Sequence, residues 1–273
     1  MLHSDEAYYA PKSKRKCIAN TSTSSSAAPC TSVTQLRTIV QDLDMNEIAQ
    51  YFLQEEAAPY VVCDGIDVDV FNRYFGHENL PIPLRCVELL EGQLLIVEYP
   101  ISAVHESTIH EFEYEFMHSC GDGRQFGKKG STTCHRGGNP DKEADATYGP
   151  LRDTPGRTPP PVLNNGSNHE IQDWITLAVE VGRAQPWASL ERAAIWWLEY
   201  PGIQYVLLIK VIERARAMSY CLYDILNYAH QNQLPAPVAT QSFRNQANGA
   251  AINIALDNDG FCRFHQLRFY HLV

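Results

Sequence analysis

The sequence predicts an α/β domain in which helices flank a central mixed sheet, and three segments carry this prediction. Residues 87–98 contain two apolar runs on either side of a Glu-Gly pair, the pattern of a β-hairpin. Residues 103–118 place apolar side chains at helical spacing, which indicates a helix with one buried face. Residues 174–211 read as strand, helix and strand, and this order favours parallel pairing with a right-handed crossover.

The chain is predicted to divide into four parts. Its 273 residues, 44% hydrophobic and 20% charged, are typical of one large globular domain with extensions. Residues 1–34 are rich in Ser, Thr and Lys with few large apolar side chains, so we expect a disordered tail. We expect a helical extension over residues 35–78, the main core over 79–235, and C-terminal strands packing on that core over 236–273.

In the first half of the chain, the helical extension is predicted from apolar residues at helical spacing, namely Leu36, Ile39, Val40 and Leu43, then Ile48, Phe52 and Leu53. The helix at 103–118 would bury Ile109, Phe112 and Phe116. Residues 119–142 are predicted to be a loop with a short strand. The segment 148–168 contains five prolines and is predicted to be a mobile surface excursion.

In the second half, a strand is predicted at residues 174–182. A helix then begins near Pro186 and ends before the Pro201-Gly202 pair, and a further strand follows at 204–211. These elements form the strand, helix and strand unit described above.

The remaining residues are predicted to form a helix over 213–231 and two strands, at 251–256 and 262–270. The turn at 257–260 lacks the spaced ligands and terminal glutamate of a calcium loop, so we predict a plain hairpin turn.

The formal net charge of −10 argues against tight nonspecific binding to nucleic acid. The net charge does not exclude a local basic groove. We expect no membrane span and no secretory segment, and therefore an intracellular protein, cytoplasmic or nuclear. The basic run at residues 12–16 is either a nuclear-import signal or a solvated tail. The eight cysteines show no CxxC pair and are expected to be free thiols. The sequence does not give the oligomeric state.

Two acidic residues, Asp145 and Glu180, are candidates for a metal site. Glu180 lies near the end of an apolar strand, where a lone carboxylate is costly unless it is paired or binds a cation. A second acid arriving nearby therefore suggests a shared ion. The side chains on the same face of the strand are small and leave space for it: Thr176, Ala178 and Gly182. In the alternative interpretation, Asp145 caps a turn and Glu180 pairs with Arg183 or Lys210.

The order of hairpin, helix, strand with Asp145, strand with Glu180, helix and strand resembles the restriction-endonuclease-like, PD-(D/E)XK superfamily. It is most similar to a branch of uncharacterised fungal proteins named for a restriction endonuclease domain. The resemblance covers about residues 80–211. Four segments carry it: Tyr-Pro-Ile-Ser-Ala-Val-His-Glu at 99–106, Gly-Ser-Thr-Thr at 130–133, Lys-Glu-Ala-Asp-Ala-Thr at 142–147, and Val-Glu-Val-Gly at 179–182 followed by Trp196-Trp197-Leu198.

The resemblance implies hydrolysis of DNA phosphodiester bonds that depends on Mg²⁺ or Mn²⁺. It implies that Asp145 and Glu180 are catalytic residues and metal ligands. His105 and Glu106 are expected to cap or pack the first helix, and Glu106 is also a candidate third ligand.

In the superfamily a lysine stands two residues after the glutamate, where it stabilises developing charge or orients water. Here that position is Gly182. We rank Lys210 first as the catalytic replacement, because an ammonium group in an apolar strand needs a carboxylate partner. Arg183 and Lys142 are the alternatives.

Other departures from the fungal branch keep a second function open. Ala144 stands where the branch has proline, Ala193 where it has aspartate, and residues 184–186 where it has Ser-Glu-Ser. The alternative is a catalytically inactive nuclease-fold protein whose acidic surface binds a protein partner. A competing zinc site is awkward because its Cys-His pair is adjacent in sequence; its ligands would be His118, Cys120, Cys134 and His135.

Overall fold

The structure is a computed structural model, and it describes residues 30–77, 80–119, 126–151, 174–212, 217–225, 233–244, 251–252 and 267–268. Its centre is a six-stranded sheet with the strand order β11-β10-β9-β8-β7-β4. The strands β8 and β9 are parallel and the other pairs are antiparallel, so the sheet is mixed as predicted. The bounds are β4 Phe126–Gly130, β7 Ala146–Pro150, β8 Leu177–Gly182, β9 Tyr205–Ile212, β10 Ala217–Asp224 and β11 Ala239–Arg244.

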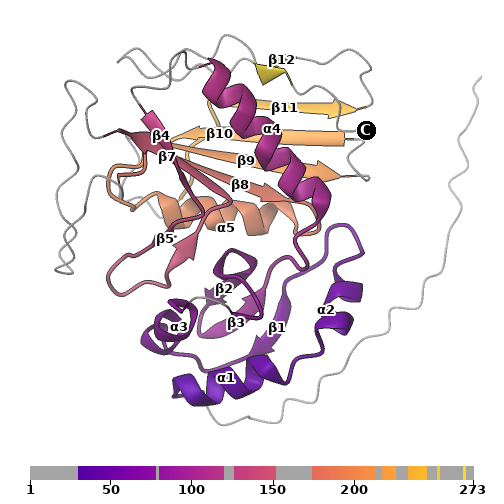
Figure 1. The fold of residues 1–273 in the computed structure, drawn as a ribbon, viewed down its shortest axis with the longest axis vertical. Helices are drawn as coiled ribbons and strands as arrows, with labels where there is room; N and C mark the ends of the chain where they lie inside the picture. The colour runs from indigo at the N-terminus through magenta and orange to yellow at the C-terminus, as the bar shows by residue number, and fades with distance from the viewer. Residues whose placement is uncertain are drawn as a thin grey trace, which may run out of the picture.

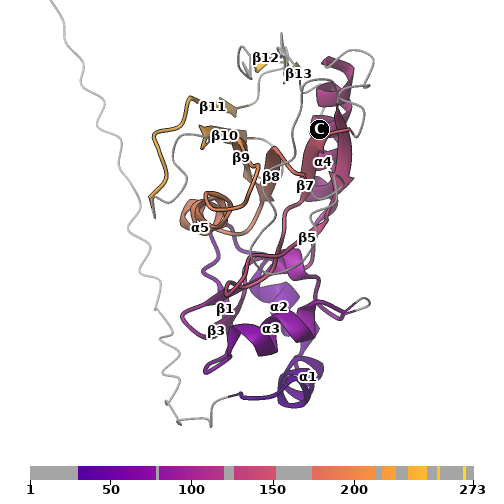
Figure 2. The same cartoon turned by 90° about the vertical axis from the view of Figure 1, so that its left-hand side faces the viewer.

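One long helix covers each face of this sheet, which confirms the predicted α/β class. Figure 2 shows the sheet nearly edge-on between α4 (Ala103–Ser119) and α5 (Trp187–Trp197). The apolar stripe of α4 is the predicted one, and it packs on Val179 and Leu207. On the opposite face α5 buries Leu190, Ala194 and Trp197 against Ala178, Val206 and Leu208. Successive residues of β8 point to opposite faces, so Glu180 lies on the α5 side with Ala178.

A second, smaller body precedes the sheet, and we call residues 30–97 the N-terminal unit. Figure 1 shows it below the sheet. It contains a three-stranded sheet of order β1-β3-β2 and a separate hydrophobic core. The predicted hairpin is confirmed, but it pairs with β1 and not with the main sheet. The elements are α1 Val33–Gln41, α2 Met45–Tyr51, β1 Tyr60–Cys63, α3 Val68–Phe75, η1 Leu84–Cys86, β2 Val87–Leu90 and β3 Gln93–Ile96.

The N-terminal unit is bound to the segment that follows β8. The backbone N–H of Ala57 donates to the carbonyl oxygen of Ala184 at 2.8 Å, and Ala184 is buried in the core of the N-terminal unit. A second link joins β2 to α5, where Arg192 Nη2 lies 2.9 Å from Glu88 Oε2. The unit therefore forms a wall beside the end of the strand that carries Glu180.

The prediction of a helix at residues 213–231 is wrong for the part that the structure describes. Residues 217–224 form β10, which is bonded to β9 on one side and to β11 on the other. Tyr220 and Leu222 are buried in the core under α4, while Ser219 and Cys221, which alternate with them, are only half-buried. This alternation has the strand period of two, and ladder bonds on both sides outweigh the local helical pattern.

Two further boundaries differ from the sequence analysis. Tyr148 and Pro150 belong to β7 and are buried, although the surface excursion was predicted to begin at Tyr148. Cys30 is buried and Ser32 caps α1, so residues 30–34 belong to the folded unit and not to the predicted tail. The remainder of the predicted tail, the basic run, residues 152–168 and the turn at 257–260 lie outside the described residues.

Two short ladders complete the description. Strand β5 (Thr133–Cys134) pairs with β6 (Lys142–Glu143), which places Lys142 just before β7. Strand β12 (Ala251–Ile252) pairs with β13 (Leu267–Arg268) within two of the predicted C-terminal segments. Among the helices that the structure describes, none combines the length and the apolar character needed to cross a bilayer.

Candidate functional site

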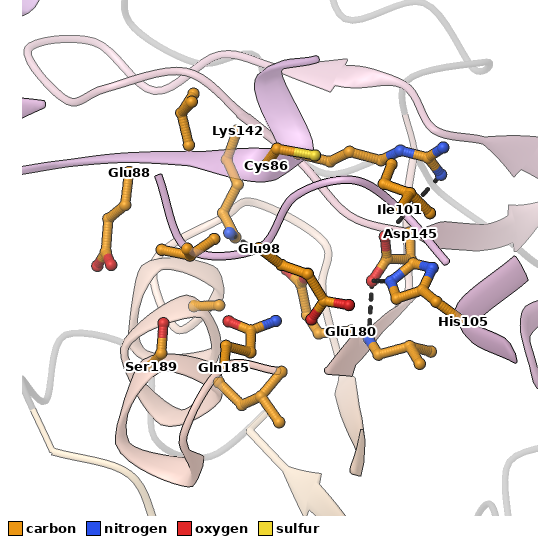
Figure 3. Close-up of a pocket in the computed structure, with 16 residues that line it drawn as sticks. Cys86, Glu88, Glu98, Ile101, His105, Lys142, Asp145, Glu180, Gln185 and Ser189 are labelled. Atoms are coloured by element: carbon orange, nitrogen blue, oxygen red, sulfur yellow. Dashed lines mark hydrogen bonds and ion pairs between the residues drawn. The ribbon is translucent and has the colours of Figure 1, made fainter. Parts of the chain in front are cut away.

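The strand register brings Asp145 and Glu180 together. Ala146 is opposite Val179 in the antiparallel ladder of β7 and β8, so Asp145, one residue earlier, lies beside Glu180, one residue later. The backbone N–H of Val181 donates to Asp145 Oδ2 at 2.7 Å, which anchors this carboxylate at the edge of β8. Both acids line one cavity, shown in Figure 3. The two acids are 35 positions apart in sequence and adjacent in space.

Glu180 is a buried carboxylate with two donors. Its side chain is 8% exposed, and Oε1 accepts a hydrogen bond of 2.7 Å from the indole N–H of Trp197. Lys142 Nζ lies 3.4 Å from the same oxygen. Burial raises the pKa of Glu180 and Asp145 raises it further, while Lys142 and the Trp197 hydrogen bond oppose the rise. Burial and Asp145 together thus disfavour the charged carboxylate, which a cation would stabilise.

The structure brings Lys142, and not Lys210, to the two acids. Lys142 projects from β6 into the cavity. The ammonium of Lys210 instead donates to the carbonyl oxygens of Arg183 and Gln185 and lies 3.0 Å from Glu56 Oε1. Lys210 therefore fastens the segment after β8 to the N-terminal unit. Lys210 therefore makes no contact with Glu180 that would support its predicted catalytic role. Arg183, the other predicted partner of Glu180, does not pair with it either.

Side chains crowd the space beside Gly182, the position at which the resemblance predicts a lysine. A Cβ atom on Gly182 would lie 2.8 Å from Gln185 Cγ and 3.0 Å from Leu190 Cδ1. Both neighbours also line the cavity. Glycine at this position leaves room for Gln185 and Leu190, and a basic group must reach the acids from elsewhere. Lys142 does so from the β6 side.

His105 and Arg85 surround Asp145. His105, near the start of α4, is 4% exposed, and its Nε2 lies 3.3 Å from Asp145 Oδ2. Arg85 Nη1 is 4.0 Å from Asp145 Oδ1, and its Nη2 is 2.9 Å from Glu106 Oε1. Glu106 thus pairs with Arg85 outside the cavity lining, so the structure gives no support to its role as a third ligand.

The burial of His105 alone would lower its pKa, but the carboxylates of Asp145 and Glu98 raise it to about 9. The imidazolium therefore stabilises the folded chain fully below the unfolded pKa of about 6.5, and this stabilisation is lost as the pH rises through 9. The loss is on the order of 3 kcal/mol.

We therefore expect the free energy of unfolding to fall between pH 6.5 and pH 9, and to fall less in the variant His105→Gln. Urea denaturation at both pH values measures this difference. His110→Gln is the matched control, because His110 lies on the same helix with its side chain 72% exposed. A wild-type chain and a His105→Gln variant with the same pH dependence would contradict the assignment.

The sequence analysis missed Glu98 as a site residue. Glu98 follows β3, is 5% exposed and lines the same cavity. Its Oε2 accepts backbone hydrogen bonds from Arg183 at 2.8 Å and from Ala184 at 3.3 Å. The signal was present in the sequence, since Glu98 ends an apolar run in the same way that Glu180 does. The sequence carries no local signal that the hairpin packs against the end of β8, and so Glu98 could not be assigned to the site.

The cavity between these side chains has a volume of about 30 Å³, which is room for an ion with a water molecule. Within the described residues, no three His, Cys, Asp or Glu side chains are placed to ligate one metal together. Cys134 is buried and donates toward the carbonyl oxygen of Thr132. His135 pairs with Asp141 at 2.9 Å, and the zinc alternative also needs Cys120, which lies outside the described part.

Comparisons with known proteins add a likeness of structure. No family model matches the chain, and no curated protein matches it. A crystal structure described as a putative nuclease belonging to DUF820, from Anabaena variabilis, is similar with a TM-score of 0.45 and 16% sequence identity. The match covers 74% of this chain and 94% of that chain.

Proposed function

We propose that this chain is a nuclease that hydrolyses DNA phosphodiester bonds with Mg²⁺ or Mn²⁺ held by Asp145 and Glu180. The observation that carries the proposal is the adjacent pair of buried carboxylates, one of which has a pKa raised by burial and by the other acid. Carboxylate oxygens suit a hard cation, and Mg²⁺ commonly takes only one or two protein carboxylates with its remaining positions filled by water and phosphate. The donor set therefore fits the ion.

Each residue of the site has a separate task. A bound cation would polarise the phosphate and lower the pKa of a water molecule. Asp145, anchored by the N–H of Val181, and Glu180, anchored by Trp197, are held in place before any ion arrives. Lys142 supplies a positive charge next to Glu180, in the role that the superfamily gives to the lysine absent at Gly182.

Lys142→Gln is expected to lower the metal-dependent rate of cleavage by about 100-fold, because it removes the one ammonium beside the two acids among the described residues. Lys210→Gln is the matched variant. It removes buried contacts to two carbonyl oxygens and is expected to cost about 1–3 kcal/mol of stability with cleavage retained. Initial rates on supercoiled plasmid and urea midpoints measure both effects. The opposite result, cleavage lost in folded Lys210→Gln and kept in Lys142→Gln, would return the role to Lys210.

The proposal as a whole is tested on the unaltered chain. Purified protein should nick supercoiled plasmid with Mg²⁺ or Mn²⁺ and should stop when EDTA is added. The same ions should raise the melting temperature, because a ligand that binds only the folded state stabilises it. If there is neither cleavage nor a shift with divalent ions, the nuclease proposal fails and the inactive interaction module is favoured.

A further inference from the structure

Glu98 reaches the site from the N-terminal side, and among the residues that the structure describes only one of its two oxygens has hydrogen-bond donors. Its Oε2 is held by the backbone N–H groups of Arg183 and Ala184, which follow directly after the strand of Glu180. Two donors to one oxygen fix the orientation of the carboxylate. The other oxygen therefore has a set direction and does not rotate freely.

The second oxygen, Oε1, is buried and has no hydrogen-bond partner among the described residues. A buried acceptor without a donor costs free energy, so a native structure supplies a partner for it. Figure 3 shows Glu98 in the cavity with Asp145, Glu180 and Lys142. The ring of His105 lies beside Glu98, but its Nε2 is directed to Asp145 and is not available to Glu98. The cavity volume of about 30 Å³ is enough for a cation together with a water molecule.

We propose that Glu98 is a positioning residue whose free oxygen holds a water molecule carried by the cation between Asp145 and Glu180. This inference rests on the proposed function. Glu98 acts through water and not as a third ligand, because the described side chains do not provide three metal-ligating groups around one point. Magnesium keeps several of its water molecules in proteins, and groups that orient such outer contacts tune its affinity.

The variant Glu98→Gln tests the roles of the two carboxylate oxygens separately. The amide oxygen of glutamine can accept the bonds from Arg183 and Ala184, while its NH₂ group replaces an acceptor with a donor on the cavity side. We expect the dissociation constant for Mn²⁺, measured by electron paramagnetic resonance on the full chain, to rise by about 10- to 100-fold. Without metal, the melting temperature should fall only by the stabilisation that His105 loses with the neighbouring charge, whereas the increase on adding Mn²⁺ should shrink. If Glu98 had a purely structural role, the substitution would lower the melting temperature without metal and leave the increase on adding Mn²⁺ unchanged.

Glu88→Gln is the control, since it removes a negative charge from the same wall but from a side chain paired with Arg192. Its Mn²⁺ affinity should stay within about 3-fold of the wild type. If the wild-type chain binds Mn²⁺ and Glu98→Gln binds it equally well, the role of Glu98 is refuted and the two-carboxylate site stands. If the wild-type chain binds no Mn²⁺, both proposals fall. Should Glu98→Gln not fold, Glu98→Asp keeps the charge but withdraws the oxygen by one methylene, and wild-type affinity in that variant would equally refute the role.

Discussion

Asp145→Asn is expected to reduce metal-dependent DNA cleavage by at least about 1000-fold, because a bound cation contributes several kcal/mol of transition-state stabilisation. Asparagine is nearly the same shape, and its amide oxygen can still accept the hydrogen bond from Val181. The substitution removes the charge that the cation and His105 both need. Initial rates of plasmid nicking with Mg²⁺ and with Mn²⁺ measure the effect.

Glu106→Gln is the matched control for Asp145→Asn. Glu106 carries the same type of charge near the site, but it pairs with Arg85 and does not line the cavity. We expect cleavage by this variant to stay within a few-fold of the wild type. Equal cleavage by the wild type and Asp145→Asn would show that the activity comes from a contaminating enzyme, and loss of metal binding in Glu106→Gln would restore Glu106 as a ligand.

Trp197→Ala is expected to cost about 3–5 kcal/mol of stability, which is a large share of the 5–15 kcal/mol typical of a domain. The ring of Trp197 is fully buried, lies 5.3 Å from the ring of Tyr200 between centroids, and fills the core between α5 and the sheet. The substitution leaves a cavity and also removes the N–H donor of Glu180. Urea denaturation with a constant m-value measures the loss.

Two phenylalanine variants separate the hydrogen bond from the packing. Trp197→Phe keeps an aromatic ring in the core but leaves Glu180 with one donor fewer, and we expect a cost of about 1.5–3 kcal/mol. In Trp196→Phe the donor lost is one to the neutral carbonyl oxygen of Pro140, so the cost should be about 0.5–1.5 kcal/mol. If the two variants lose the same stability, the hydrogen bond from Trp197 to Glu180 contributes no more to the free energy of unfolding than the bond from Trp196 to Pro140.

Part of the main sheet could be predicted because some of its signals are local. The parallel pair β8 and β9 follows from two apolar runs joined by a helix of suitable length. In the N-terminal unit, the hairpin turn follows from Gly92, which adopts a φ of 78° without steric cost, whereas its neighbour Glu91 takes a φ of 51° that nothing in its residue type predicts. Strand β10 could not be separated from a helix by pattern alone, because its strand state depends on neighbours on both sides.

The candidate site was predictable only in part. Asp145 and Glu180 could be paired from their position on successive strands and from the resemblance to a known superfamily. The partners of these acids come from elements whose packing has no local signal: Lys142 from β6, Trp197 from α5 and Glu98 from the end of the hairpin. Lys210 was ranked first from strand position alone. Its ammonium is engaged instead by carbonyl oxygens in the turn after β8.

The burial of Ala184 inside the core of the N-terminal unit couples the folding of the two bodies. A loop that leaves the strand of Glu180 is part of the interior of residues 30–97, and Glu98 holds the backbone of the same loop. Shortening the chain to the sheet and its two helices would therefore expose that interior and release the loop at once. The two bodies are therefore expected to melt in a single cooperative transition.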